Sequence, residues 1–74
     1  MKTREIYEQL ESWRYERENL GKEVAQLQAA FRAAQAEEND DDFDWLAEMY
    51  RDTRVRLQEA EKRIEMLESH LELL

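Results

Sequence analysis

The stretch of the sequence that decides the fold is residues 37–42, EENDDD. It interrupts two long segments in which apolar residues recur every three or four positions. Short Asp and Asn side chains hydrogen-bond nearby backbone groups, so they are poor in helix interiors and favoured in turns and at helix N-caps. The stretch therefore predicts a turn at about 39–41 between two helices, with Asp41 or Asp42 as the N-cap of the second.

On both sides of this stretch the apolar residues follow a heptad template, with steps that alternate between four and three. We call the a and d positions of this template its seats. The seats before the stretch are Ile6, Leu10, Trp13, Arg17, Leu20, Val24, Leu27, Phe31 and Ala34. The seats after it are Phe43, Leu46, Tyr50, Thr53, Leu57, Ala60, Ile64, Leu67, Leu71 and Leu74. Seventeen of these 19 seats are apolar, whereas random placement of 42% hydrophobic residues would fill about eight.

This periodicity predicts an all-α protein, because strands have a period of two. We expect helices at about 3–38 and 42–74, which together make residues 1–74 one antiparallel two-helix coiled-coil hairpin. An open parallel coiled coil, formed by the second helix with its own copy, is the competing interpretation. The short acidic turn favours the hairpin, because a turn of a few residues joins antiparallel neighbours.

Charges beside the seats agree with the hairpin. With Leu10 and Tyr50 labelled as a positions, folding about the turn brings Glu16 to Arg63 and Glu23 to Arg56. On the other flank Arg14 can reach Glu61 or Glu68. These matches select an orientation more than they stabilise it, because exposed ion pairs contribute only about 0–1 kcal/mol.

One seam leaves apolar residues uncovered, so we expect a homodimer in which two hairpins form a four-helix bundle. Small residues would let a second helix approach closely. The candidate interface residues are Gly21, Ala29, Ala30, Ala33 and Met49. Arg17 and Gly21 together make a weak point in the first helix, read either as a device that sets the register or as a place where another helix packs.

The charge is concentrated in the middle of the chain. The net charge is −8, of which residues 23–50 carry −7, since eight acids there face the single base Arg32. Such a field repels nucleic acid and anionic lipid and attracts basic protein surfaces. The simpler interpretation is that the acids keep a small helical protein in solution.

Catalysis, metals and cofactors are not expected. The chain has no Cys and one histidine, His70, without a second ligand at helical spacing. Asp40, Asp42 and Asp44 have calcium-loop spacing, but Trp45 and Arg51 stand where such a loop needs Gly and Glu. There is no membrane-length apolar run and no signal-peptide core, so we expect a cytoplasmic protein.

The hairpin tip is the sharpest functional hypothesis. It combines acids with two aromatic rings and would dock on a basic, grooved protein partner; its residues are Asp40, Asp41, Asp42, Phe43, Asp44 and Trp45. The alternative role of the two rings is to close the end of the bundle. We therefore expect a non-enzymatic interaction module, such as an adaptor or chaperone-like regulatory subunit.

Two other functions stay open. One is an acidic mimic of nucleic acid that inhibits a DNA- or RNA-binding protein. The other is a small RNA-binding hairpin dimer, for which Arg51, Arg54, Arg56 and Arg63 would contact phosphates. Interleaved acids make direct binding of nucleic acid the weaker expectation.

Overall fold

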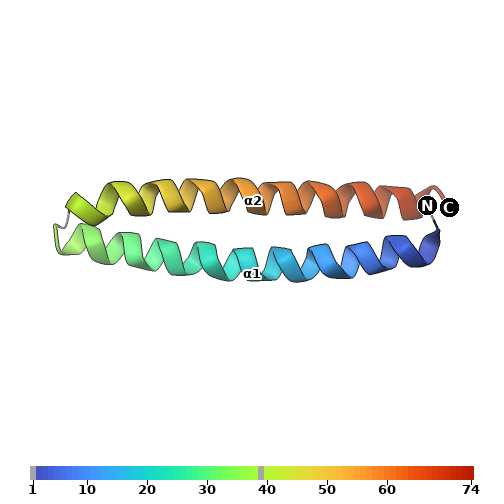
Figure 1. The fold of residues 1–74 in the computed structure, drawn as a ribbon, viewed down its shortest axis with the longest axis horizontal. Coiled ribbons are helices and arrows are strands. Elements are labelled where there is room, and N and C mark those ends of the chain that lie inside the picture. Colours follow the sequence, from blue (N-terminus) through green and yellow to red (C-terminus); the bar gives the residue numbers. More distant parts are fainter. Residues whose placement is uncertain (1, 39) are drawn as a thin grey trace.

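The chain folds into two long helices that lie side by side and run in opposite directions (Figure 1). The computed structural model describes residues 2–38 and 40–74, without the side chain of Asp40. Helix α1 spans Thr3–Ala36 and helix α2 spans Asp40–Glu72. The result is a rod of 54 × 14 × 13 Å with both chain ends at the same end. The predicted all-α hairpin is confirmed.

The turn lies two residues earlier than predicted. Helix α1 ends at Ala36, and the N–H groups of Glu37 and Glu38 donate to the carbonyls of Ala33 and Gln35. Glu38 has a φ of 55°, the left-handed conformation that often ends a helix and usually belongs to Gly. Since α2 begins at Asp40, Asp41 and Asp42 lie in its first turn, and the N-cap prediction for them was wrong. Position 39 of the predicted turn lies outside the described residues.

The acids are suited to the first turn of α2 for a different reason. The free N–H groups at a helix N-terminus form the positive end of its dipole, which favours carboxylates in the first turn. A run of acids therefore marks the beginning of a helix without fixing which acid caps it.

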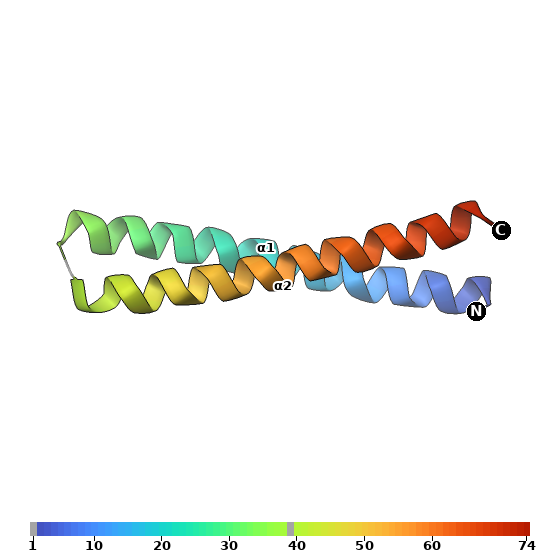
Figure 2. The same cartoon turned by 90° about the horizontal axis from the view of Figure 1, so that it is seen from above.

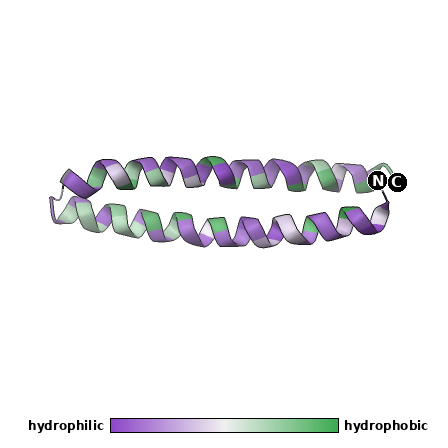
Figure 3. Ribbon diagram, viewed as in Figure 1, coloured by the Kyte–Doolittle hydropathy of each residue, from purple (hydrophilic) through white to green (hydrophobic). Residues whose placement is uncertain are grey.

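The core is a seam of buried residues between the helices. Hydrophobic residues recur along both helices (Figure 3). Every side chain that is buried in the described chain occupies a predicted seat: Ile6, Leu10, Leu20, Leu27, Ala34, Leu46, Thr53, Ala60, Ile64 and Leu67. Viewed from above, the helices cross near their middles (Figure 2). A crossing of this kind keeps the a and d residues facing the partner helix along the seam.

Two polar seats behave differently. Arg17 is exposed, so its charged group is not part of the core. Thr53 is buried, and its hydroxyl donates to the carbonyl of Met49 over 2.8 Å. The one buried polar side chain in the described chain is thereby satisfied within its own helix.

Cross-helix charges agree with the prediction in part. Arg14 and Glu68 form an ion pair of 3.7 Å, as predicted. Within the described residues, neither Glu16 nor Glu23 forms its predicted pair. The guanidinium of Arg63 lies 6.0 Å from the centroid of the Trp13 ring instead. An exposed arginine has many rotamers of similar energy, so a facing carboxylate does not decide its position.

Candidate functional site

The first two turns of α2 form the hairpin tip, and they hold its charged residues on a helix. The side chains of Asp41, Asp42 and Asp44 are exposed. Asp40 begins α2, and its side chain lies outside the described part of the structure. The predicted tip residues are therefore grouped within one short helical segment.

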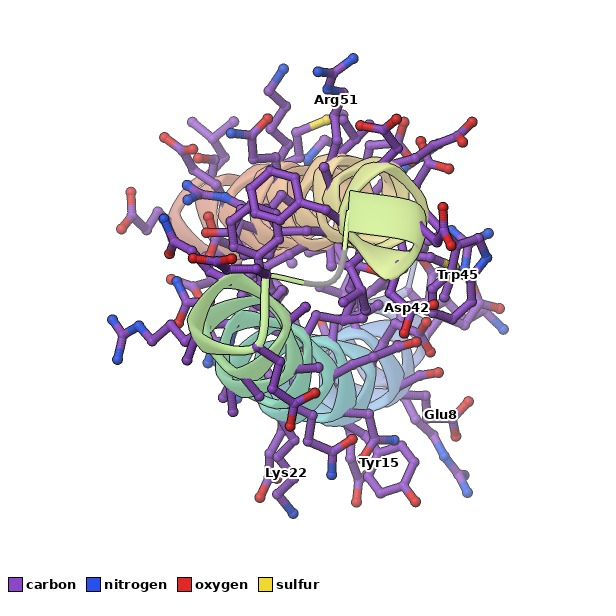
Figure 4. All side chains as sticks on the ribbon, turned by 90° about the vertical axis from the view of Figure 1, so that its left-hand side faces the viewer. Glu8, Tyr15, Lys22, Asp42, Trp45 and Arg51 are labelled. Carbon is purple, nitrogen blue, oxygen red and sulfur yellow. The ribbon has the colours of Figure 1, made fainter. Side chains whose placement is uncertain are left out.

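Trp45 is the exposed aromatic ring of the tip. Its side chain is 58% exposed. Seen along the rod from the tip, Trp45 projects sideways from α2, on the same side as Asp42 (Figure 4). Arg51 projects from α2 in another direction, away from α1.

Phe43 is the ring that closes the end of the core. It is half-buried, and its centroid lies 4.3 Å from that of Phe31. It also lines a small pocket with Ala34, Gln35 and Glu38. The two aromatic residues of the tip thus point to two different roles, because Phe43 packs within the hairpin and Trp45 faces solvent.

A groove lies beside the core in the half of the hairpin next to the tip. Its volume is about 640 Å³, and its lining residues are Gln28, Phe31, Arg32, Ala47, Tyr50, Arg51, Arg54, Val55 and Gln58. Three of these are arginines and none is an acid, although the chain as a whole carries −8. The groove is a basic patch on an acidic protein.

Tyr50 organises one wall of this groove. Its hydroxyl oxygen accepts hydrogen bonds from Gln28 Nε2 over 3.0 Å and from Arg54 Nη1 over 3.2 Å. The guanidinium of Arg54 also lies 5.8 Å from the centroid of the Tyr50 ring. The hydrogen bond from Arg54, and after it that from Gln28, lowers the pKa of the Tyr50 phenol below 10.0, because both donors favour the phenolate.

Sequence reasoning did not identify this groove. From the sequence, Arg51 and Arg54 are expected to be phosphate contacts or solvated charges. No sequence pattern assigns a binding role to Gln28 or Arg32. The available signal was a second periodic stripe on α2, at residues 44, 47, 51, 54 and 58, beside the apolar seam. This stripe gives a weak signal because most of its residues are polar or charged, like those of any solvent-exposed helix face.

The predicted dimer-interface residues lie on both helices. Ala29, Ala30 and Ala33 are exposed on α1. Met49 is half-buried and packs against the core cluster of Leu27, Ala34 and Leu46. A Cβ added to Gly21 would meet nothing within 4 Å, so no helix within the hairpin approaches closely there.

The rest of the described surface offers no arrangement of metal ligands. Nowhere in residues 2–38 and 40–74 do three or more His, Cys, Asp or Glu side chains gather in a way that could hold a metal ion. His70 Nδ1 lies 3.1 Å from the Met66 carbonyl oxygen on its own helix. Neither helix, over its described residues, has an apolar stretch long enough to cross a membrane.

Comparison with known proteins identifies no relative of the chain. No protein-family model matches the chain, and no curated protein or solved structure shows significant similarity to it.

Proposed function

We propose that the protein is a non-enzymatic protein–protein interaction module, a small adaptor or chaperone-like regulatory subunit, that binds a protein partner through its hairpin tip. The observation that carries the proposal is the ring of Trp45, which is 58% exposed on a helix among exposed acids. Aromatic side chains that can be fully covered by a partner are the commonest source of binding energy at protein interfaces.

The charge around Trp45 defines the kind of partner. Residues 23–50 carry −7, and the exposed acids of the tip are Asp41, Asp42 and Asp44. A basic partner surface would be attracted over about one Debye length, which accelerates the encounter and makes it sensitive to salt. The partner we propose is therefore a protein with a basic groove that can receive an indole ring. No cofactor enters the proposal, and a cytoplasmic location is part of it.

We also propose that the protein acts as a homodimer containing a four-helix bundle. The backbone of the rod is only 14 × 13 Å across, and one seam buries its core. Several large apolar side chains stay exposed, namely Tyr7, Tyr15, Trp45, Val55, Met66, Leu73 and Leu74. A second copy would enlarge a thin core, which is the usual way for a short chain to gain stability.

A capture experiment tests the tip. The immobilised hairpin is used to isolate the partner from a native lysate, and the kinetics of the purified pair are then measured. Trp45→Ala should speed dissociation by about thirtyfold or more, the effect of a hot-spot residue. Tyr15→Ala is the matched control, because Tyr15 is 67% exposed on α1, outside the tip and the groove. Equal effects of the two variants would contradict the proposal.

The acids are tested by removing their charge while keeping their shape. Replacing Asp40, Asp41 and Asp42 together by Asn should leave the hairpin folded, because it removes only the interaction of each charge with the α2 dipole, about 0.3–1 kcal/mol for an exposed acid. Association with the basic partner should slow at low salt, and the difference from the parent should shrink at high salt. An association rate equal to that of the parent at low salt would show that the acids do not steer binding.

The same capture separates the two alternative functions. A DNA- or RNA-binding protein that is lost at high salt would favour the acidic mimic. RNA that purifies with the hairpin would favour the RNA-binding dimer, with the groove arginines as its phosphate contacts.

A further inference from the structure

The α2 residues that line the basic groove lie on one stripe of the helix, and this stripe also contains an acidic residue. Residues Ala47, Arg51, Arg54 and Gln58 line the groove and follow each other at steps of four, three and four. Asp44 lies three residues before Ala47, so it extends the same stripe toward the tip. Residues at such steps share one face of a helix. This face is separate from the apolar seam that packs α2 on α1.

The charges on this face are arranged about its smallest residue. Asp44 lies three residues before Ala47, and Arg51 lies four residues after it. A two-fold axis beside Ala47, perpendicular to α2, would therefore place Asp44 of one copy within one residue, about 1.5 Å along the helix, of Arg51 of the other. The contact would occur twice, because a two-fold interface repeats each pair. The half-buried Ala47, which carries only a methyl group, would allow the two helices to approach closely at the axis.

The side chains of the groove are available for such a pairing. Within the described residues, neither Arg32 nor Arg51 forms an ion pair. Arg51 points away from α1 (Figure 4). Val55 in the groove wall is 49% exposed, an apolar surface that a second helix would cover. Tyr50 accepts two hydrogen bonds and still carries a hydroxyl proton that can be donated to an incoming group.

From these features we propose that the groove is the homodimer interface, in which the tip halves of two hairpins pack antiparallel, with α2 against α2 about Ala47 and Asp44 of each copy facing the partner's Arg51. The inference rests on the dimerisation proposed above and specifies its face. It places the interface on the groove side of the hairpin and leaves Ala29, Ala30 and Ala33 uncovered. Trp45 lies six residues before Arg51, about 120° away around the helix, and so stays accessible to a different partner.

Charge exchange tests the pairing directly. Sedimentation over a range of concentrations should show that the parent dimerises and that salt weakens the dimer. Arg51→Glu sets Glu against Asp44 twice in each dimer, and Asp44→Arg sets two arginines together twice. Each single variant should dimerise at least about tenfold more weakly than the parent. An equimolar mixture of the two variants should form a heterodimer of near-parental affinity, because every contact then pairs opposite charges.

Two controls exclude trivial causes. The double variant D44R/R51E carries the folding cost of both changes, yet it restores opposite charges and should dimerise like the parent. Lys2→Glu makes the same charge change as Arg51→Glu at the open end of the rod, and it should leave the dimer unchanged. Circular dichroism confirms that each variant is helical.

Specific results would overturn the inference. A parent that stays monomeric at all concentrations refutes both the dimer and its face, even if the groove then retains an acidic peptide or RNA. A parent dimer that Arg51→Glu does not weaken refutes the groove face alone, as does a mixture that forms no heterodimer. Because Trp45 lies outside this face, capture of a partner through the tip is measured on the same variants and stands or falls separately.

Discussion

At the open end of the hairpin, Ile6 and Leu10 of α1 pack against Ile64 and Leu67 of α2. Ile6 and Leu10 are each only 1% exposed, and half-buried rings or chains of Trp13 and Leu71 pack around the cluster. At the tip, the cluster is smaller and more open. It consists of Leu27, Ala34 and Leu46, bordered by the half-buried side chains of Phe31, Met49 and Tyr50.

The two ends differ because the turn connects only one of them. At the tip, the short connection keeps the helices together at little entropic cost. At the open end, only side-chain packing opposes fraying, and the tightest cluster is found there. The lighter packing at the tip leaves room for a groove and for exposed aromatic surface. The end joined by the turn is therefore the end that carries the groove. Exposed apolar side chains are found in the open half as well, namely Tyr7, Tyr15, Met66, Leu73 and Leu74.

The largest expected effect is a loss of stability when the tightly packed cluster at the open end is disturbed. Leu10→Ala should destabilise the protein by about 2–5 kcal/mol, because it leaves a cavity in the tight cluster. That is a large share of the roughly 4–11 kcal/mol expected for a domain of this size. Leu46→Ala, in the more open tip cluster, should cost less. Urea denaturation followed by circular dichroism, at one low protein concentration, measures both.

An equal loss in the two variants would show that the clusters contribute alike. A larger loss for Leu46→Ala would reverse the comparison and make the tip the better-packed end.

The second effect concerns the connection itself. Glu38 holds a φ of 55°, which disfavours any side chain that has a Cβ. Glu38→Gly should therefore stabilise the hairpin by about 1 kcal/mol. Glu37, with a φ of −88°, is the matched control, and Glu37→Gly should give no gain. Thermal or urea denaturation separates the two, and equal behaviour would show that the left-handed residue costs nothing.

A third change lies between the two ends. Gly21→Ala should stabilise α1 by about 1 kcal/mol, because Ala is the better helix former and its Cβ meets nothing within 4 Å. Dimerisation should be unaffected, since Gly21 lies far from the groove. Weaker association of this variant in sedimentation would instead assign Gly21 to the interface and move that interface away from the tip.

The smallest effect is the ionisation of Tyr50 beside the groove. Its pKa lies below 10.0 because Arg54 and Gln28 donate to the phenol oxygen. The folded state is thus stabilised only as the pH rises through this lowered pKa toward 10.0, and not at neutral pH. The difference in ultraviolet absorbance between the parent and Tyr50→Phe gives the titration. Arg54→Gln should shift the midpoint upward, and an unchanged midpoint would contradict the hydrogen bond.

The buried residues of the seam could be predicted because each helix carries its own heptad pattern, which does not depend on the other helix. Burial follows a period that is visible in the sequence, so residues as different as Ala60 and Thr53 were assigned to the core correctly. The boundary of α2 was less certain, because Asp is favoured both as an N-cap and in the first turn. A run of such residues has no periodicity that would locate the start.

The groove could not be predicted in the same way. It depends on how the flanks of two helices approach each other, and its arginines come from distant parts of the chain, with Arg32 on α1 and Arg51 and Arg54 on α2. The position of Arg63 over Trp13 shows the same limit. Long exposed side chains choose among neighbours that only the assembled hairpin brings together.

The slender outline of the hairpin has a practical consequence for measuring its mass. Its radius of gyration is 16.6 Å, whereas a compact domain of 74 residues would have about 11 Å. The value 16.6 Å is that of a globular protein of about 200 residues. A single 9.0 kDa chain will therefore elute early from a size-exclusion column and resemble an oligomer. Light scattering or sedimentation equilibrium, which weigh the particle, will distinguish one rod from two.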